Sequence, residues 1–68
     1  MITFQNGNSY NSIPKSSIKI IVYGAGQNYI RVIFNRIAAD GSDEWQDYTF
    51  PTAMDAARTY FSISGGQL

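Results

Sequence analysis

The sequence predicts an α+β fold in which an antiparallel sheet of three to five strands carries one C-terminal helix packed on one face. Two runs rich in β-branched and aromatic residues, 18–23 and 29–34, flank a glycine-containing segment, a pattern typical of a β-hairpin. After Pro51, an alanine-rich segment with apolar residues at helical spacing indicates an amphipathic helix.

One domain is expected over residues 1–68, because a chain of this length is too short for two hydrophobic cores. It divides into a peripheral β-flap (1–13), a central β-meander (17–50) and a helix (52–63). A single core of this size contributes only about 3 to 5 kcal/mol to stability, so small domains usually add disulfides or a metal. The sequence has no Cys and no His, and compact packing or self-association is expected instead.

The N-terminal flap is expected to turn at Asn6-Gly7, a strong signal for a two-residue hairpin loop. This turn places Phe4 opposite Ser9. The return strand is polar, and Pro14 ends it because proline donates no main-chain hydrogen bond.

Side-chain alternation assigns the two faces of the central hairpin. The core face is predicted to be purely apolar and comprises Ile18, Ile20, Val22, Ile30, Val32 and Phe34. For the apolar residues of the two strands to lie on the same face, the residue numbers of each cross-strand pair must sum to an even value. Val22 opposite Ile30 and Val22 opposite Val32 both satisfy this condition, and the sequence does not choose between them.

A second turn is predicted at Ala39-Asp40-Gly41, a three-residue loop with Gly41 in the left-handed conformation. The register set by this loop places Asn35 opposite Trp45. A two-residue Asp-Gly turn would move the apolar residues to the wrong face. The preferred register therefore puts Trp45 on the face of the sheet opposite the core, which we call the outer face.

The predicted outer face is the candidate binding site, because an exposed aromatic residue beside an arginine is typical of interface hot spots. The candidate residues are Trp45, Tyr23, Tyr29, Arg31, Ile21, Ile33, Lys19 and Asp47. In the alternative arrangement, the N-terminal flap folds over Trp45 and forms a second small core.

The helix is predicted to begin at Thr52, an N-cap residue followed three positions later by Asp55 in an approximate capping box. Met54, Ala57 and Phe61 recur at positions i, i+3 and i+7, so this stripe is predicted to face the sheet.

The residue inventory excludes the common catalytic arrangements. Without His or Cys, neither Ser-His-Asp nor Cys-His sites can form. The segment 24–26 lacks the third glycine and the following helix of a dinucleotide fingerprint, and the acidic turn 40–44 lacks the glutamate that completes a calcium loop. We expect a protein that is not an enzyme and binds no cofactor or metal.

The net charge is zero, but its distribution is uneven. Residues 1–36 contain four basic and no acidic side chains, whereas residues 37–68 contain five acidic side chains and only Arg58 as a base. Charge pairing between neighbouring strands is the simpler interpretation, and a dipolar surface that steers a charged partner is the alternative. The balanced charge makes phosphate attraction weak, so nucleic acid is not the expected partner.

The leading hypothesis is a non-catalytic protein-interaction module, a small inhibitor or adaptor that uses the outer face or a sheet edge. A weak single-stranded nucleic-acid-binding module is one alternative function, and a homodimer is the alternative to a different protein partner. In the arrangement of its elements from Ser17 to Phe61, the chain resembles some very small phage-encoded inhibitors, including certain anti-CRISPR proteins, which also place one helix on an antiparallel sheet. This resemblance implies a small anti-defence inhibitor as the other alternative function. With no signal peptide and no apolar run near the ~18 residues that span a bilayer, the expected protein is cytoplasmic and makes no membrane contact.

Overall fold

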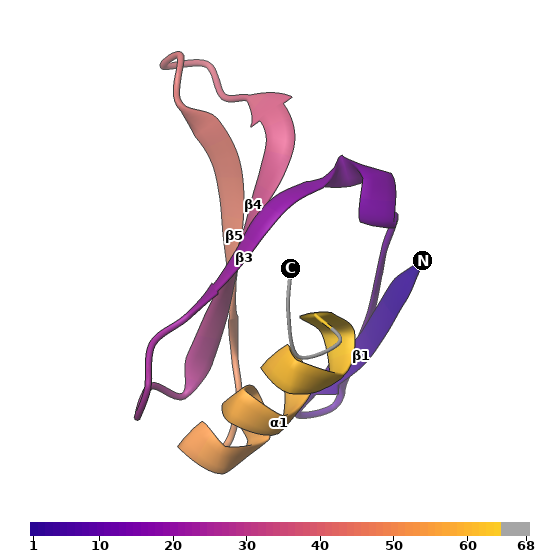
Figure 1. Ribbon diagram of the computed structural model, residues 1–68, viewed down its shortest axis with the longest axis vertical. Helices are drawn as coiled ribbons and strands as arrows, with labels where there is room; N and C mark the ends of the chain where they lie inside the picture. The colour runs from indigo at the N-terminus through magenta and orange to yellow at the C-terminus, as the bar shows by residue number, and fades with distance from the viewer. Residues whose placement is uncertain (65–68) are drawn as a thin grey trace.

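The computed structural model describes residues 1–64 (Figure 1). In chain order its elements are β1 (Ile2–Asn6), β2 (Ser9–Ile13), the short 3₁₀ helix η1 (Lys15–Ser17), β3 (Ile18–Tyr23), β4 (Tyr29–Ile37), β5 (Asp43–Thr49) and α1 (Ala53–Ser64).

Two antiparallel sheets and one C-terminal helix make up the fold, which confirms the predicted α+β class. β1 and β2 form a two-stranded sheet, and the other strands form a second sheet in the order β3-β4-β5. Figure 1 shows α1 and the β1–β2 hairpin on the same side of the three-stranded sheet. Among residues 1–64, no helix is long and apolar enough to cross a membrane.

The hydrophobic core lies between the three-stranded sheet and the layer formed by α1 and the β1–β2 hairpin. Ile30 and Val32 of β4 have no exposed surface and form its centre. Burial of an aliphatic side chain of this size contributes about 1.5 to 3 kcal/mol, so the central strand anchors both layers. The other core residues are Ile2, Phe4, Ile13, Ile21, Phe34, Phe50 and Ala56.

The N-terminal hairpin turns one residue later than predicted. Asn6 pairs with Ser9, so the two-residue loop is Gly7-Asn8, and Phe4 does not face Ser9. Gly7 has a φ of 63° and Asn8 has no positive φ. This is the type II′ arrangement, which requires glycine at the first loop position, whereas the predicted loop would require two residues with positive φ.

The hairpin that the sequence analysis treats as a peripheral flap contributes three side chains to the core. The ring of Phe4 packs edge to face against Tyr48, with 5.0 Å between the ring centroids. Ile2 and Ile13, which lie opposite each other, are also buried. The hairpin therefore completes the main core, and the alternative in which it covers Trp45 does not occur.

β3 contains one extra residue, which reverses the predicted faces of most of the strand. Ile18 pairs with Phe34, yet Ile20 already pairs with Ile33, so Lys19 has no partner of its own. Such a β-bulge shifts every following residue to the opposite face.

Beyond the bulge, the predicted face assignment of β3 is therefore wrong. Ile21 is 3% exposed and Tyr23 packs against the core, whereas Ile20 and Val22 are each 44% exposed. The middle of the strand is aliphatic on both faces, so hydrophobic alternation alone does not fix its orientation. The contact of Tyr23 with the helix favours the observed orientation of β3, because the Tyr23 ring stacks on Tyr60 of α1, with 5.5 Å between the ring centroids.

The turn between β4 and β5 forms as predicted. Gly41 has a φ of 88°, and its N–H donates to the carbonyl of Ala38 at 3.0 Å. The carboxylate of Asp40 accepts hydrogen bonds from the N–H and hydroxyl of Ser42, at 3.0 and 2.6 Å. Local turn chemistry therefore fixes this loop.

The register next to this turn is the predicted one, with Ile37 opposite Asp43. Farther along, β4 is irregular, and Ile33 pairs with Trp45. The predicted pairing of Asn35 with Trp45 is thus wrong by two residues. Because the shift is even, Trp45 stays on the predicted face.

The start of α1 agrees with the sequence signal. The hydroxyl of Thr52 accepts a hydrogen bond from the N–H of Asp55 at 3.1 Å, which satisfies one of the free N–H groups of the first turn.

The predicted apolar stripe of α1 is wrong for its two large residues. Met54 and Phe61 are more than half exposed, whereas Ala56 is fully buried and Tyr60 and Ile63 pack against the core. The buried residues form a second stripe at helical spacing, rotated about the helix axis from the predicted one. The small side chain at position 56 lets the helix approach the sheet, and the Tyr60 ring then reaches its stacking partner on β3.

Substitutions at two neighbouring aromatic residues test this orientation of α1. Tyr60→Ala should lower the free energy of unfolding by about 2 kcal/mol, because it removes a packed ring. Phe61→Ala should lower it by only about 0.5 kcal/mol, since that ring is mostly in water. Urea unfolding followed by circular dichroism measures both values. A larger loss for Phe61→Ala than for Tyr60→Ala would contradict the orientation.

Candidate partner-binding face

The outer face is the side of the β3-β4-β5 sheet that α1 and the β1–β2 hairpin leave uncovered. Cross-strand pairing arranges its residues in rows that run from β3 through β4 to β5. The first row is apolar, because Ile20 lies opposite Ile33, which lies opposite Trp45. Trp45 is 51% exposed and Ile33 is half-buried. Three strands therefore place an aliphatic, an aliphatic and an indole side chain beside one another.

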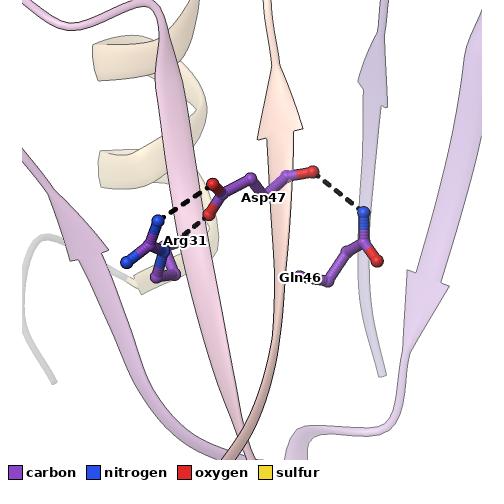
Figure 2. Close-up of polar contacts among 3 residues, drawn as sticks. All are labelled: Arg31, Gln46 and Asp47. Carbon is purple, nitrogen blue, oxygen red and sulfur yellow. Dashed lines mark hydrogen bonds and ion pairs between the residues drawn. The ribbon is translucent and has the colours of Figure 1, made fainter.

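The second row of the outer face contains an ion pair. Val22 lies opposite Arg31, which lies opposite Asp47. The guanidinium donates two hydrogen bonds to the carboxylate, from Nε to Oδ1 at 2.7 Å and from Nη2 to Oδ2 at 3.1 Å (Figure 2). Two parallel bonds fix the plane of the guanidinium.

The orientation of Arg31 connects the two rows. Its guanidinium carbon lies 4.1 Å from the centre of the Trp45 ring, within the range of a cation–π interaction. Asp47 thus holds the guanidinium on one side while the indole supports it on the other. Figure 2 also shows that the side chain of the neighbouring residue, Gln46, points away from this pair and donates to the main-chain carbonyl of Asp47.

The ion pair shifts the titration of both partners. The hydrogen bonds from Arg31 lower the pKa of Asp47 below the usual aspartate range, and this effect outweighs the opposing effect of partial burial. The hydrogen bond to Asp47 raises the pKa of Arg31 in turn. Both side chains are about a third exposed, so the pair orients the guanidinium while adding little net stability.

A second ion pair crosses the sheet beside the bulge. The ammonium of Lys19 lies 2.8 Å from the carboxylate of Asp43 on β5. The two cations predicted for this face, Lys19 and Arg31, are therefore each matched by a carboxylate. The outer face is close to electrically neutral, with apolar side chains between two ion pairs.

Most of the predicted site residues lie on the outer face. Arg31, Ile33, Trp45 and Asp47 occupy the two rows, Tyr29 lies next to them opposite Thr49, and Lys19 reaches across from the bulge.

Two predicted residues, Ile21 and Tyr23, do not belong to the face, because the bulge turns them into the core. Ile20 and Val22 take their places and are missed by the sequence analysis. The local signal that could have identified them is the lysine at position 19, since a charged residue between two apolar ones is a suitable bulge position at a sheet edge.

Removal of the Asp47 carboxylate tests the link between the ion pair and the indole. A carboxylate with a lowered pKa stabilises the folded protein above the normal aspartate range of about pH 4, and this contribution is lost as the pH falls below it. Protonation of Asp47 should release Arg31 and change the emission of Trp45, the single tryptophan. Wild-type protein should therefore show an acid transition in tryptophan fluorescence that Asp47→Asn lacks.

The matched control for this titration is Asp43→Asn, which removes the same charge from the second ion pair. This variant should keep the acid transition. A transition that persists unchanged in Asp47→Asn would contradict the assigned contact between Arg31 and the indole.

The outer face combines an oriented guanidinium, an exposed indole and an aliphatic row, and it offers no clustered metal ligands. Among residues 1–64, no group of three acidic, His or Cys side chains is arranged to hold a metal ion. Such a face suits contact with another folded surface. No protein-family model, curated protein or solved structure matches the chain.

Proposed function

We propose that this chain is a non-catalytic protein-interaction module of the cytoplasm that binds a protein partner through its outer face. The observation that carries the proposal is the exposed cluster of Ile20, Val22 and Trp45 around the guanidinium of Arg31. Tryptophan and arginine are the residues most enriched at interface hot spots, and contiguous exposed apolar side chains mark interaction sites.

The ion pairs of the outer face support a protein partner over a nucleic acid. Attraction to phosphates depends on unpaired cations that release counterions. Lys19 and Arg31 are instead held by Asp43 and Asp47 at hydrogen-bond distance. The pairs supply donors and acceptors in fixed positions at the edge of an apolar patch, which is the usual composition of a protein interface.

A small inhibitor or adaptor is the role we favour for such a module. The residue inventory supports this role, because the sequence lacks His and Cys, the common general base and the strongest side-chain nucleophile. A small phage-encoded anti-defence inhibitor is the alternative role, and its only basis is the general arrangement of one helix on an antiparallel sheet.

A second copy of the chain is the competing occupant of the outer face. Its charges are self-complementary, because a two-fold axis would bring Arg31 of one copy to Asp47 of the other. Sedimentation measurements across a dilution series distinguish this case. A concentration-dependent mass that Trp45→Ala abolishes would assign the face to a homodimer.

Capture experiments with matched aromatic variants test the proposed partner-binding face. Tagged wild-type chain should retain a protein partner, and Trp45→Ala should weaken that binding by about 30-fold, the loss expected for a hot-spot residue. Tyr10→Ala is the control, because Tyr10 is 79% exposed but lies on β2, away from the outer face. Binding that survives Trp45→Ala but is lost in Tyr10→Ala would refute the proposed face.

A further inference from the structure

A groove lies along β1 and α1, on the side of the molecule that carries the hairpin and the helix. Its volume is about 510 Å³, within the range of known ligand sites. Figure 1 shows the strand and the helix beside each other. The lining of the groove includes consecutive residues of β1, the segment Phe50-Pro51 and two charged residues of α1, Asp55 and Arg58.

The wall formed by β1 is the edge of the strand and not one of its faces. Three consecutive residues, Thr3, Phe4 and Gln5, line the groove. Successive side chains of a strand point to opposite faces, so a groove above one face would be lined by alternate residues. Consecutive lining residues mean that the groove runs along the main chain.

The hairpin register identifies which main-chain groups point into the groove. A two-residue hairpin loop is closed by a pair that exchanges main-chain hydrogen bonds, which here is Asn6 and Ser9. Bonded and non-bonded pairs alternate along an antiparallel ladder. The main-chain N–H and C=O groups of Thr3 and Gln5 therefore point away from β2, toward the groove.

These edge groups have no partner among residues 1–64. β1 pairs only with β2 in its two-stranded sheet, and no other hydrogen bond within the described part of the chain reaches the main chain of Thr3 or Gln5. The two main-chain N–H donors and two C=O acceptors thus lie along the free edge of β1, with the spacing that an added strand requires.

The other walls of the groove present the surfaces that the side chains of a bound ligand would contact. Pro51, which is exposed, forms an apolar wall together with the small uncovered parts of Phe4 and Phe50, which are 7% and 3% exposed. Asn6 donates to the carbonyl of Thr49 at 3.3 Å, which places the turn end of β1 beside this wall.

Two charged residues of the helix make one part of the groove negative and another part positive. Asp55 lies in the first turn of α1, and Arg58 lies about one turn farther along. The Arg58 guanidinium contacts the sulfur of Met54 at 3.3 Å, and no carboxylate within residues 1–64 forms an ion pair with it. A negative charge in the ligand is thus favoured near Arg58 and disfavoured near Asp55.

We propose that this groove binds an extended peptide segment of a partner protein, which adds to β1 as a third strand. The main chain of the peptide pairs with Thr3 and Gln5, an apolar side chain contacts the wall near Phe50, and an acidic side chain pairs with Arg58. This mode of recognition takes affinity from main-chain hydrogen bonds and specificity from alternate side chains. The site is separate from the outer face and acts independently of Trp45.

Proline substitutions on the two edges of the same hairpin provide the test. Thr3→Pro removes an N–H that points into the groove and breaks no bond to β2, and edge positions tolerate proline. Tyr10→Pro is the matched control, because Tyr10 pairs with Gln5 and its N–H points to the far edge of β2. Circular dichroism and thermal unfolding establish that both variants are folded.

The probe is a phage-displayed library of random decapeptides selected on the full-length chain. Enriched peptides should carry an acidic residue near an apolar one, and synthetic copies should bind Thr3→Pro about tenfold more weakly than wild type, the loss expected for one or two main-chain hydrogen bonds. Tyr10→Pro and Trp45→Ala should bind them as wild type does. Arg58→Glu should weaken binding and Arg58→Lys should restore part of it.

Amide hydrogen exchange provides a readout that does not depend on variants. The amides of Thr3 and Gln5 should exchange rapidly in the free protein and become protected in the presence of a selected peptide, while the amide of Tyr10 stays unprotected. The proposal is overturned if no peptide is enriched, if enriched peptides bind Thr3→Pro as tightly as wild type, or if Trp45→Ala abolishes their binding. The last result would instead assign the peptides to the outer face.

Discussion

The bulge at Lys19 is the constraint on which the arrangement of both faces of the large sheet depends. One extra residue between Ile18 and Ile20 turns the rest of β3 over. The side-chain amide of Asn35 donates to the carbonyls of Ser16 and Ile18, at 3.2 and 3.3 Å, and so pairs main-chain oxygens at the irregular position. The bulge residue itself extends across the sheet to Asp43.

Both sides of the sheet take their composition from this shift. On the covered side, Ile21 enters the core and Tyr23 stacks on Tyr60, which fixes the rotation of α1. On the other side, Ile20 and Val22 join Trp45 and extend the apolar surface from one edge of the sheet to the other. The buried helix face and the exposed cluster are thus two consequences of one irregularity in β3.

Features specified by a few adjacent residues could be predicted from the sequence. The loop at Gly41 and the cap at Thr52 depend on local turn and capping chemistry, and both form as expected. The placement of Arg31, Trp45 and Asp47 on one face also follows from that loop, because the later slip in register is even.

Features decided by tertiary packing could not be predicted in this way. Isoleucine at both 20 and 21 lets either face of β3 be buried, and the contact between Tyr23 and Tyr60 favours the face that carries Ile21. The same contact orients α1 with Tyr60 inward and Phe61 outward, although both residues are aromatic. The groove beside β1 escaped sequence analysis because it is formed by elements that are distant in the chain.

The reactivity of single cysteines introduced along β3 tests the central claim most directly, since the natural chain has no cysteine to interfere. A thiol reagent should modify Ile20→Cys and Val22→Cys rapidly in the folded protein. It should modify Ile21→Cys only slowly, at a rate that approaches the others when the protein is unfolded in urea. Rapid reaction at position 21 with protection at positions 20 and 22 would contradict the bulge, and with it the outer face described above.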